Sequence, residues 1–180
     1  MEFFLDTGPI FAYSNPYNKP HHAHCREFFN KYTFDSNYFC TAKELIRIEL
    51  DNIRRKRSEF DQHQTARSIE RQLEYLLDEI IHDVDYKDNK MFDQIFTGIY
   101  HLLEINKIDQ NPKERDAKLL SHAFIWDNQN SHLRNPCFLT IDGADIGWNR
   151  EEIKEEVRTC FECRIKLMIL TVKEMIESGL

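Results

Sequence analysis

The sequence predicts an α/β protein with a mostly parallel β-sheet. Short apolar runs, typical of buried strands, alternate along the chain with longer amphipathic segments that carry helix-start signals. Strands and helices that alternate in this way favour a parallel sheet covered by helices. The chain has 180 residues, of which 41% are hydrophobic and only 5 are Gly and 5 Pro, and this composition fits a single domain, residues 1–180, with its own core.

The first third of the chain predicts two strands and two helices. Residues 3–5 (Phe-Phe-Leu) form an apolar run that is too short for a helix and is followed by a turn sequence. Pro20 predicts the start of a helix, and residues 38–40 (Tyr-Phe-Cys) predict a second strand. Residues 41–44 (Thr-Ala-Lys-Glu) have the form of a capping box, which predicts a helix that runs to about residue 56.

The next segment, residues 60–106, predicts a helical elaboration of the domain. Apolar residues recur at helical spacing in two places, which predicts one helix across residues 69–81 and another across residues 89–105. A further helix should begin at residues 111–114 (Asn-Pro-Lys-Glu), with Asn as its cap, and end near Trp126. A strand, a helix, a strand and a helix should then follow, at residues 136–141, 151–159, 163–170 and 172–177.

The composition also limits where the protein acts and on what. No apolar run approaches the roughly 20 residues of a membrane span, and the N-terminus lacks the basic region of a signal peptide. We therefore expect a cytoplasmic protein without a membrane partner, whose five cysteines are reduced thiols. The net charge of -7 excludes a protein that coats nucleic acid nonspecifically and suits one that binds metal cations.

Carboxylates follow two of the predicted strands directly. Asp6 ends the first strand and Asp142 ends the strand at residues 136–141. Because the carboxyl ends of parallel strands meet at one edge of a sheet, we expect the two side chains to be neighbours there. Asp145 lies three residues beyond Asp142 and can join them.

Helix geometry selects two further acids. Glu49 lies four residues from an apolar residue on each side, and Asp116 precedes three small or apolar residues at helical spacing. A carboxylate on an apolar helix face is costly unless it is paired or binds a metal. Glu44 and Glu114 are weaker candidates, because each already has the position of a helix cap.

Acids that converge on one edge would repel one another unless a cation lies among them. Mg²⁺ and Mn²⁺ prefer carboxylate and water oxygens, and two such ions can activate a water and stabilise the leaving oxygen in phosphodiester cleavage. Each acid taken alone has an equally good interpretation as a cap, a turn residue or an ion-pair partner. Their joint placement favours a metal-dependent hydrolase.

Six segments of the chain resemble, in order, those of PIN-domain nucleases. The opening strand with Asp6, the helix segment with Glu49, the helix with Asp116 and the Thr-x-Asp strand end with Asp142 are similar to the segments that carry the family's acids. The resemblance covers most of the chain, at residues 3–10, 20–29, 48–53, 115–123, 138–142 and 168–176.

The resemblance implies a three-layer α/β/α sandwich that cleaves single-stranded RNA with Mg²⁺ or Mn²⁺, often as a homodimer. Many members are toxins paired with an antitoxin, and others act in RNA processing. Carried over to this chain, it implies that Asp6, Glu49, Asp116 and Asp142 are the catalytic metal ligands, with Asp145, at a variable position, as a candidate fifth. The alternative is a PIN-like scaffold that binds RNA or a protein without cutting it.

Four residues are candidate substrate contacts. Arg54 and Arg55 belong to the strongest basic run of the chain, which either contacts phosphates or simply favours a helix C-terminus. Thr7 and Thr140 have hydroxyls that can orient a carboxylate or a water, although both can equally be turn residues.

Other motifs point to other chemistry and are weaker. The triplet at residues 6–8 (Asp-Thr-Gly) matches that of aspartic proteases, whose fold is β-rich, unlike this helical sequence. The same acids would also suit a phosphatase. His21, His24 and Cys25 can share one helix face and bind Zn²⁺, but surface or packing roles explain them better. The pair Cys160 and Cys163 is a lone C-x-x-C motif, which lacks the further ligands of a structural zinc site and the position at a helix start that a redox pair prefers.

Overall fold

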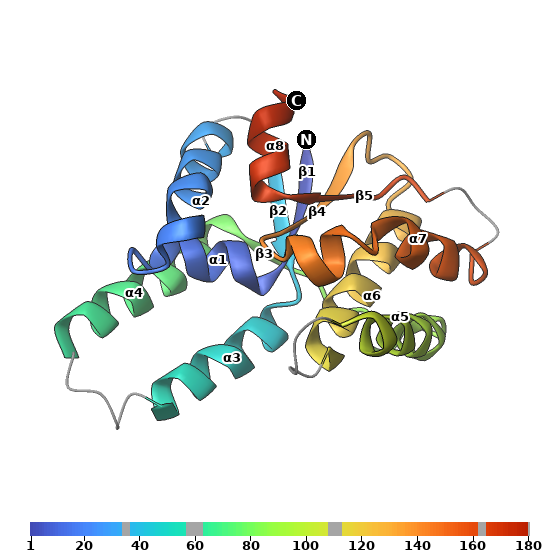
Figure 1. Ribbon diagram of the computed structural model, residues 1–180, viewed down its shortest axis with the longest axis horizontal. Helices are drawn as coiled ribbons and strands as arrows, with labels where there is room; N and C mark the ends of the chain where they lie inside the picture. Colours follow the sequence, from blue (N-terminus) through green and yellow to red (C-terminus); the bar gives the residue numbers. More distant parts are fainter. Residues whose placement is uncertain (34–36, 57–62, 108–112, 162–164, 180) are drawn as a thin grey trace.

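The computed structural model describes residues 1–33, 37–56, 63–107, 113–161 and 165–179, without the side chains of residues 19, 49, 50, 52–56 and 63–66. It contains one five-stranded sheet in which every pair of neighbours is parallel, with helices on both faces (Figure 1). The predicted three-layer α/β/α arrangement is therefore confirmed.

The strand order brings two distant segments together at the centre of the sheet. The order is β3-β2-β1-β4-β5, so that β1 (Glu2–Leu5) lies between β2 (Tyr38–Thr41) and β4 (Pro136–Thr140). The edge strands are β3 (His82–Asp83) and β5 (Met168–Thr171). Leu5 is paired with Leu139, and β1 and β4 therefore end side by side.

The side chains of β1 alternate between the two faces of the sheet. Phe3 and Leu5 belong to one buried cluster, and Phe4 belongs to the other. The first cluster is covered by α1 (Thr7–Ser14), α2 (Lys19–Tyr32), α4 (His63–Tyr75) and α8 (Val172–Ser178). The second is covered by α5 (Phe92–Asn106), α6 (Glu114–Gln129) and α7 (Arg150–Arg158). Figure 1 shows these two groups on opposite sides of the strands, with α3 (Lys43–Lys56) leading away from the end of β2.

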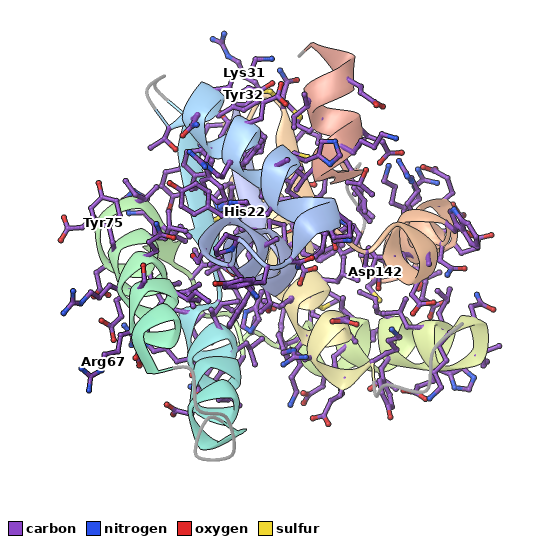
Figure 2. All side chains as sticks on the ribbon, turned by 60° about the vertical axis from the view of Figure 1, so that its left-hand side comes forward. His22, Lys31, Tyr32, Arg67, Tyr75 and Asp142 are labelled. Carbon is purple, nitrogen blue, oxygen red and sulfur yellow. The ribbon has the colours of Figure 1, made fainter. Side chains whose placement is uncertain are left out.

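The predicted helix across residues 69–81 is confirmed as far as Ile80, although its last turn is π-helical. The α4 helix ends at Tyr75 and a π-helical turn, η2, follows at Leu76–Ile80. Ile81 then adopts extended backbone, and the two residues of β3 pair with β2. The apolar spacing could not reveal this strand, because a two-residue strand exists only through the neighbour with which it pairs. Figure 2 shows Arg67 and Tyr75 projecting outward from α4.

Two predicted helix caps differ in the structure. The hydroxyl of Thr41 donates to the carbonyl of Leu5 (2.7 Å), and α3 begins at Lys43, so Thr41 is a strand residue and not the cap. The α6 helix begins at Glu114 with Lys113 in the cap position, whereas Asn111, the predicted cap, lies outside the described residues.

The cysteine expectation can be followed for four of the five residues. Cys25, Cys40, Cys137 and Cys160 are not in disulfides, as expected of reduced thiols, and Cys163 lies outside the described residues. Across the described ranges, the helices lack the combination of length and apolar character that a bilayer crossing requires.

Candidate functional site

Asp6 lies at the carboxyl end of β1 and caps α1. Its Oδ1 accepts a hydrogen bond from the backbone N–H of Thr7 (2.7 Å), and its backbone N–H donates to the carbonyl of Leu139 (3.0 Å). The side chain is 6% exposed. A Cβ on Gly8 would meet Ile141 at 2.5 Å, so glycine allows the start of α1 to pack against the residue that follows β4.

Thr140, the last residue of β4, connects Asp6 to Asp142. Its hydroxyl donates to Oδ2 of Asp6 (2.6 Å) and accepts a hydrogen bond from the backbone N–H of Asp142 (2.9 Å). Thr140 is fully buried. The hydroxyl therefore orients a carboxylate, one of the two roles considered for it, and contact with a substrate stays a prediction.

Asp142 and Asp145 are held by one π-helical turn, η3 (Gly143–Gly147). Oδ1 of Asp142 accepts hydrogen bonds from the backbone N–H groups of Ala144 (3.1 Å) and Asp145 (2.9 Å). Asp145 is 3% exposed, whereas Asp142 is partly buried. Figure 2 shows Asp142 between the ribbons of α6 and α7.

Lys113 lies among these carboxylates, although it is not among the site residues that the sequence predicts. Its Nζ is 2.5 Å from Oδ2 of Asp145, 3.9 Å from Oδ2 of Asp116 and 4.0 Å from Oδ2 of Asp142. The residue is 3% exposed. A lysine in the first turn of a predicted helix is typical of a solvated surface, and the only signal in the sequence is its distance of three residues from Asp116.

Asp116, on the first turn of α6, has a perturbed carboxyl group. Its pKa is raised to about 7, first by burial and then by the charges of Asp6 and Asp142, while the cations Lys113 and Arg115 act in the opposite direction. The four aspartates Asp6, Asp116, Asp142 and Asp145 thus form one electrostatically connected group at the carboxyl edge of β1 and β4. Asp116 is only partly buried, and a carboxyl group with such a pKa holds or releases a proton near neutral pH.

Three other predicted site residues cannot be placed. Glu49, Arg54 and Arg55 lie on α3, but their side chains are outside the described part of the structure. Thr7 is 7% exposed, and its hydroxyl is one of two buried side-chain atoms that have no hydrogen-bond partner within the described residues.

Glu44 and Glu114, the two weaker candidates, are exposed and form ion pairs at the surface. Glu44 forms an exposed ion pair with Lys87 (3.4 Å), and Glu114 forms one with Lys118 (2.6 Å) on the outside of α6. The sequence predicts Glu44 as a helix cap, whereas its side chain pairs with Lys87.

The donor atoms of the cluster suit a hard divalent cation, but the described residues do not form a ready metal site. Carboxylate oxygens are the ligands that Mg²⁺ and Mn²⁺ prefer. No set of three or more His, Cys, Asp or Glu side chains is arranged around a common metal position among the residues that the structure describes. The carboxylates of Asp116, Asp142 and Asp145 instead surround the ammonium group of Lys113.

The zinc alternative on α2 finds no support either. His21, His24 and Cys25 line a cavity of about 320 Å³ with Thr171 and Val172, but burial raises the pKa of the Cys25 thiol to about 12. Zinc binds the thiolate, which is scarce at that pKa. The partner of Cys160, Cys163, lies outside the described residues.

Comparisons of the chain with protein-family models, with curated proteins and with solved structures found no match. The class that the structure itself defines is an α/β/α protein with a buried aspartate–lysine cluster at the carboxyl edge of its central strands. Ligand and catalytic sites in open parallel sheets lie at this edge.

Proposed function

We propose that this protein is a metal-dependent endoribonuclease whose site is the aspartate cluster at the ends of β1 and β4. The observation that carries the proposal is the convergence of Asp6, Asp142 and Asp116 at the ends of β1 and β4, where the Thr140 hydroxyl connects Asp6 to Asp142. The crowding is also reflected in the pKa of the Asp116 carboxyl, which burial and the charges of Asp6 and Asp142 raise to about 7. Carboxylates crowded in this way gain most from a bound cation, because the cation removes their mutual repulsion.

The residues that would hold Mg²⁺ or Mn²⁺ are Asp116 and Asp142, with Asp6 beside them and Glu49 and Asp145 as further candidates. A bound divalent ion would lower the pKa of a water and stabilise charge on the phosphate in phosphodiester hydrolysis. The chain's own contribution is to fix the carboxylates in advance: Thr140 orients Asp6, and two backbone N–H groups orient Asp142. Ligands held in this way need little reorganisation when the ion binds.

The test is cleavage of single-stranded RNA in Mn²⁺ by the wild type and by Asp116→Asn, with Glu114→Gln as the matched control on the same turn of α6. We expect Asp116→Asn to lower the cleavage rate at least 100-fold, because it removes a charged ligand, and Glu114→Gln to leave the rate unchanged. The variant Asp6→Asn should behave as Asp116→Asn does. If Asp116→Asn cuts as fast as the control, the site is misassigned.

A second candidate, an inert scaffold that binds RNA or a protein, is favoured by Lys113. A cluster that already contains an ammonium group 2.5 Å from Asp145 is partly neutralised without any metal. This candidate predicts a folded protein that binds RNA but does not cleave it at any Mn²⁺ concentration. Calorimetric titration with Mn²⁺ and the cleavage assay together separate the two.

The partners implied by the family resemblance remain proposals with tests of their own. A homodimer is tested by sedimentation at micromolar concentration, and an antitoxin by co-purification with the product of a neighbouring gene. Phosphate contact by Arg54 and Arg55 is tested by charge removal, which should weaken RNA binding equally for all sequences.

A phosphatase using the same acids would hydrolyse a small phosphomonoester, which a nuclease would leave intact.

A further inference from the structure

Lys113 is a charged residue in a costly position. It is 3% exposed, and an ammonium group loses its hydration when it is buried to this extent. It also occupies the N-cap position of α6, where the positive end of the helix dipole disfavours a cation. Some other group must therefore offset both costs.

Contacts on two sides hold Lys113 in this position. Its backbone N–H donates to Oε1 of Glu104 on α5 (3.0 Å), which fixes the main chain, and its side chain reaches Asp145. Asp145 is itself only 3% exposed and lies on a different element, η3. The ammonium group thus joins the start of α6 to η3 through a buried ion pair, and the carboxylates of Asp116 and Asp142 lie farther from it, at 3.9 and 4.0 Å.

We infer that Lys113 is a built-in counter-ion that competes with a divalent cation for the carboxylates of the cluster. The inference rests on the proposed function for the identity of the competing ion. The carboxylates nearest to Lys113 include Asp116 and Asp142, which are the proposed ligands, so a divalent ion bound there lies close to the ammonium group. Two cations a few ångströms apart repel strongly where water is largely excluded.

The competition limits both the number of divalent ions that bind and the affinity with which they bind. Lys113 supplies one positive charge at the place where a second divalent ion would lie, and the wild type therefore takes up at most one ion, weakly. Removing the ammonium group both ends the repulsion and releases Oδ2 of Asp145 to act as a ligand.

The experiment is calorimetric titration with Mn²⁺ of the wild type and Lys113→Met, each first checked for folding by circular dichroism. Methionine replaces the apolar stem of the lysine side chain but lacks its terminal ammonium group. We expect Lys113→Met to bind Mn²⁺ at least tenfold more tightly. The matched control is Lys118→Met, which removes an exposed lysine from the next turn of α6 and should leave the affinity unchanged.

A second pair of variants covers the case in which Lys113→Met fails to fold. Asp145→Asn and the double variant Asp145→Asn/Lys113→Met differ only in the lysine, and the double variant leaves no unpaired charge at this pair. The double variant should bind Mn²⁺ more tightly than Asp145→Asn does.

The outcomes distinguish this inference from the proposed function. Equal affinities, including no detectable binding by either protein, overturn the inference, and so does weaker binding after the lysine is removed, which would make Lys113 an organiser of the metal site. Tighter binding by Lys113→Met supports the inference whether or not RNA is cleaved. Absence of cleavage with tight Mn²⁺ binding would instead remove the proposed function alone.

Discussion

Two lysines at the start of α6, Lys113 in the cap position and Lys118 within the helix, each pair with a carboxylate, but the two pairs differ in burial and in the origin of the partner. Lys118 and Glu114 lie 2.6 Å apart on the outer surface, with side chains that are 36% and 58% exposed. Lys113 and Asp145 lie 2.5 Å apart, with side chains that are 3% and 4% exposed. Water screens the first pair, whereas the second is a buried pair whose partners come from segments about thirty residues apart.

This difference shows when an ion pair is informative about function: when both partners are buried and the pair adds little to the free energy of unfolding. An exposed pair contributes between nothing and about 1 kcal/mol. A buried pair can be replaced by apolar residues with little loss of stability, although removing one partner alone is strongly destabilising. Lys113 and Asp145 are therefore better explained by what the cluster does than by what it adds to the fold.

The largest expected effect comes from breaking the buried pair. Asp145→Ala leaves the ammonium group of Lys113 without its nearest carboxylate, and we expect the free energy of unfolding to fall by about 3 kcal/mol. Urea denaturation followed by circular dichroism measures it. The decrease should be at the lower end of the range for buried pairs, because Asp116 and Asp142 remain about 4 Å from the lysine. A decrease below about 1 kcal/mol, the range of exposed pairs, would contradict the comparison.

An intermediate effect is expected from Asp116, and it depends on pH. The pKa of its carboxyl is about 7 in the folded chain against an ordinary value of 3.8, so between these values the folded chain keeps a proton that the unfolded chain has released. The contribution of Asp116 to stability is therefore undiminished below about pH 4 and is lost as the pH rises to about 7. Asp116→Asn should be more stable than the wild type by on the order of 2 kcal/mol at pH 8.

Urea denaturation at pH 5 and pH 8 tests this expectation. The advantage of Asp116→Asn over the wild type should be larger at pH 8, and addition of Mn²⁺ should reduce it if the ion binds as proposed. A difference that does not change with pH would mean that the carboxyl titrates normally. We also propose that Asp116→Asn lowers the cleavage rate. A variant that is more stable but less active would show that the Asp116 carboxylate serves catalysis while lowering the free energy of unfolding.

The smallest effect is expected at the exposed pair. Glu114→Ala removes the partner of Lys118 and a favourable charge at the first turn of α6, and we expect a loss below about 1 kcal/mol. Thermal unfolding at low and high salt measures it, and the loss should shrink in 1 M salt because the charges are screened. A loss that is independent of salt would show that Glu114 contributes through something other than its charge.

Several parts of the candidate site followed from the sequence alone. The strands that end at Asp6 and Asp142 were predictable because an apolar run that stops at a carboxylate is a local pattern, and parallel strands share one edge. Asp116 was selected by the spacing of apolar residues behind it on α6, which is again local. The alternation of strands and helices likewise predicted a parallel sheet covered by helices.

Only the tertiary structure decided the features that depend on distant neighbours. The strand β3 exists because two residues pair with β2, and the burial of Lys113 exists because η3 brings Asp145 against the start of α6. Neither is encoded in the spacing of the residues around it. The physical reason is that a charge or a short strand has the same local sequence in water as in a core, and its free energy is determined by the groups that folding places around it.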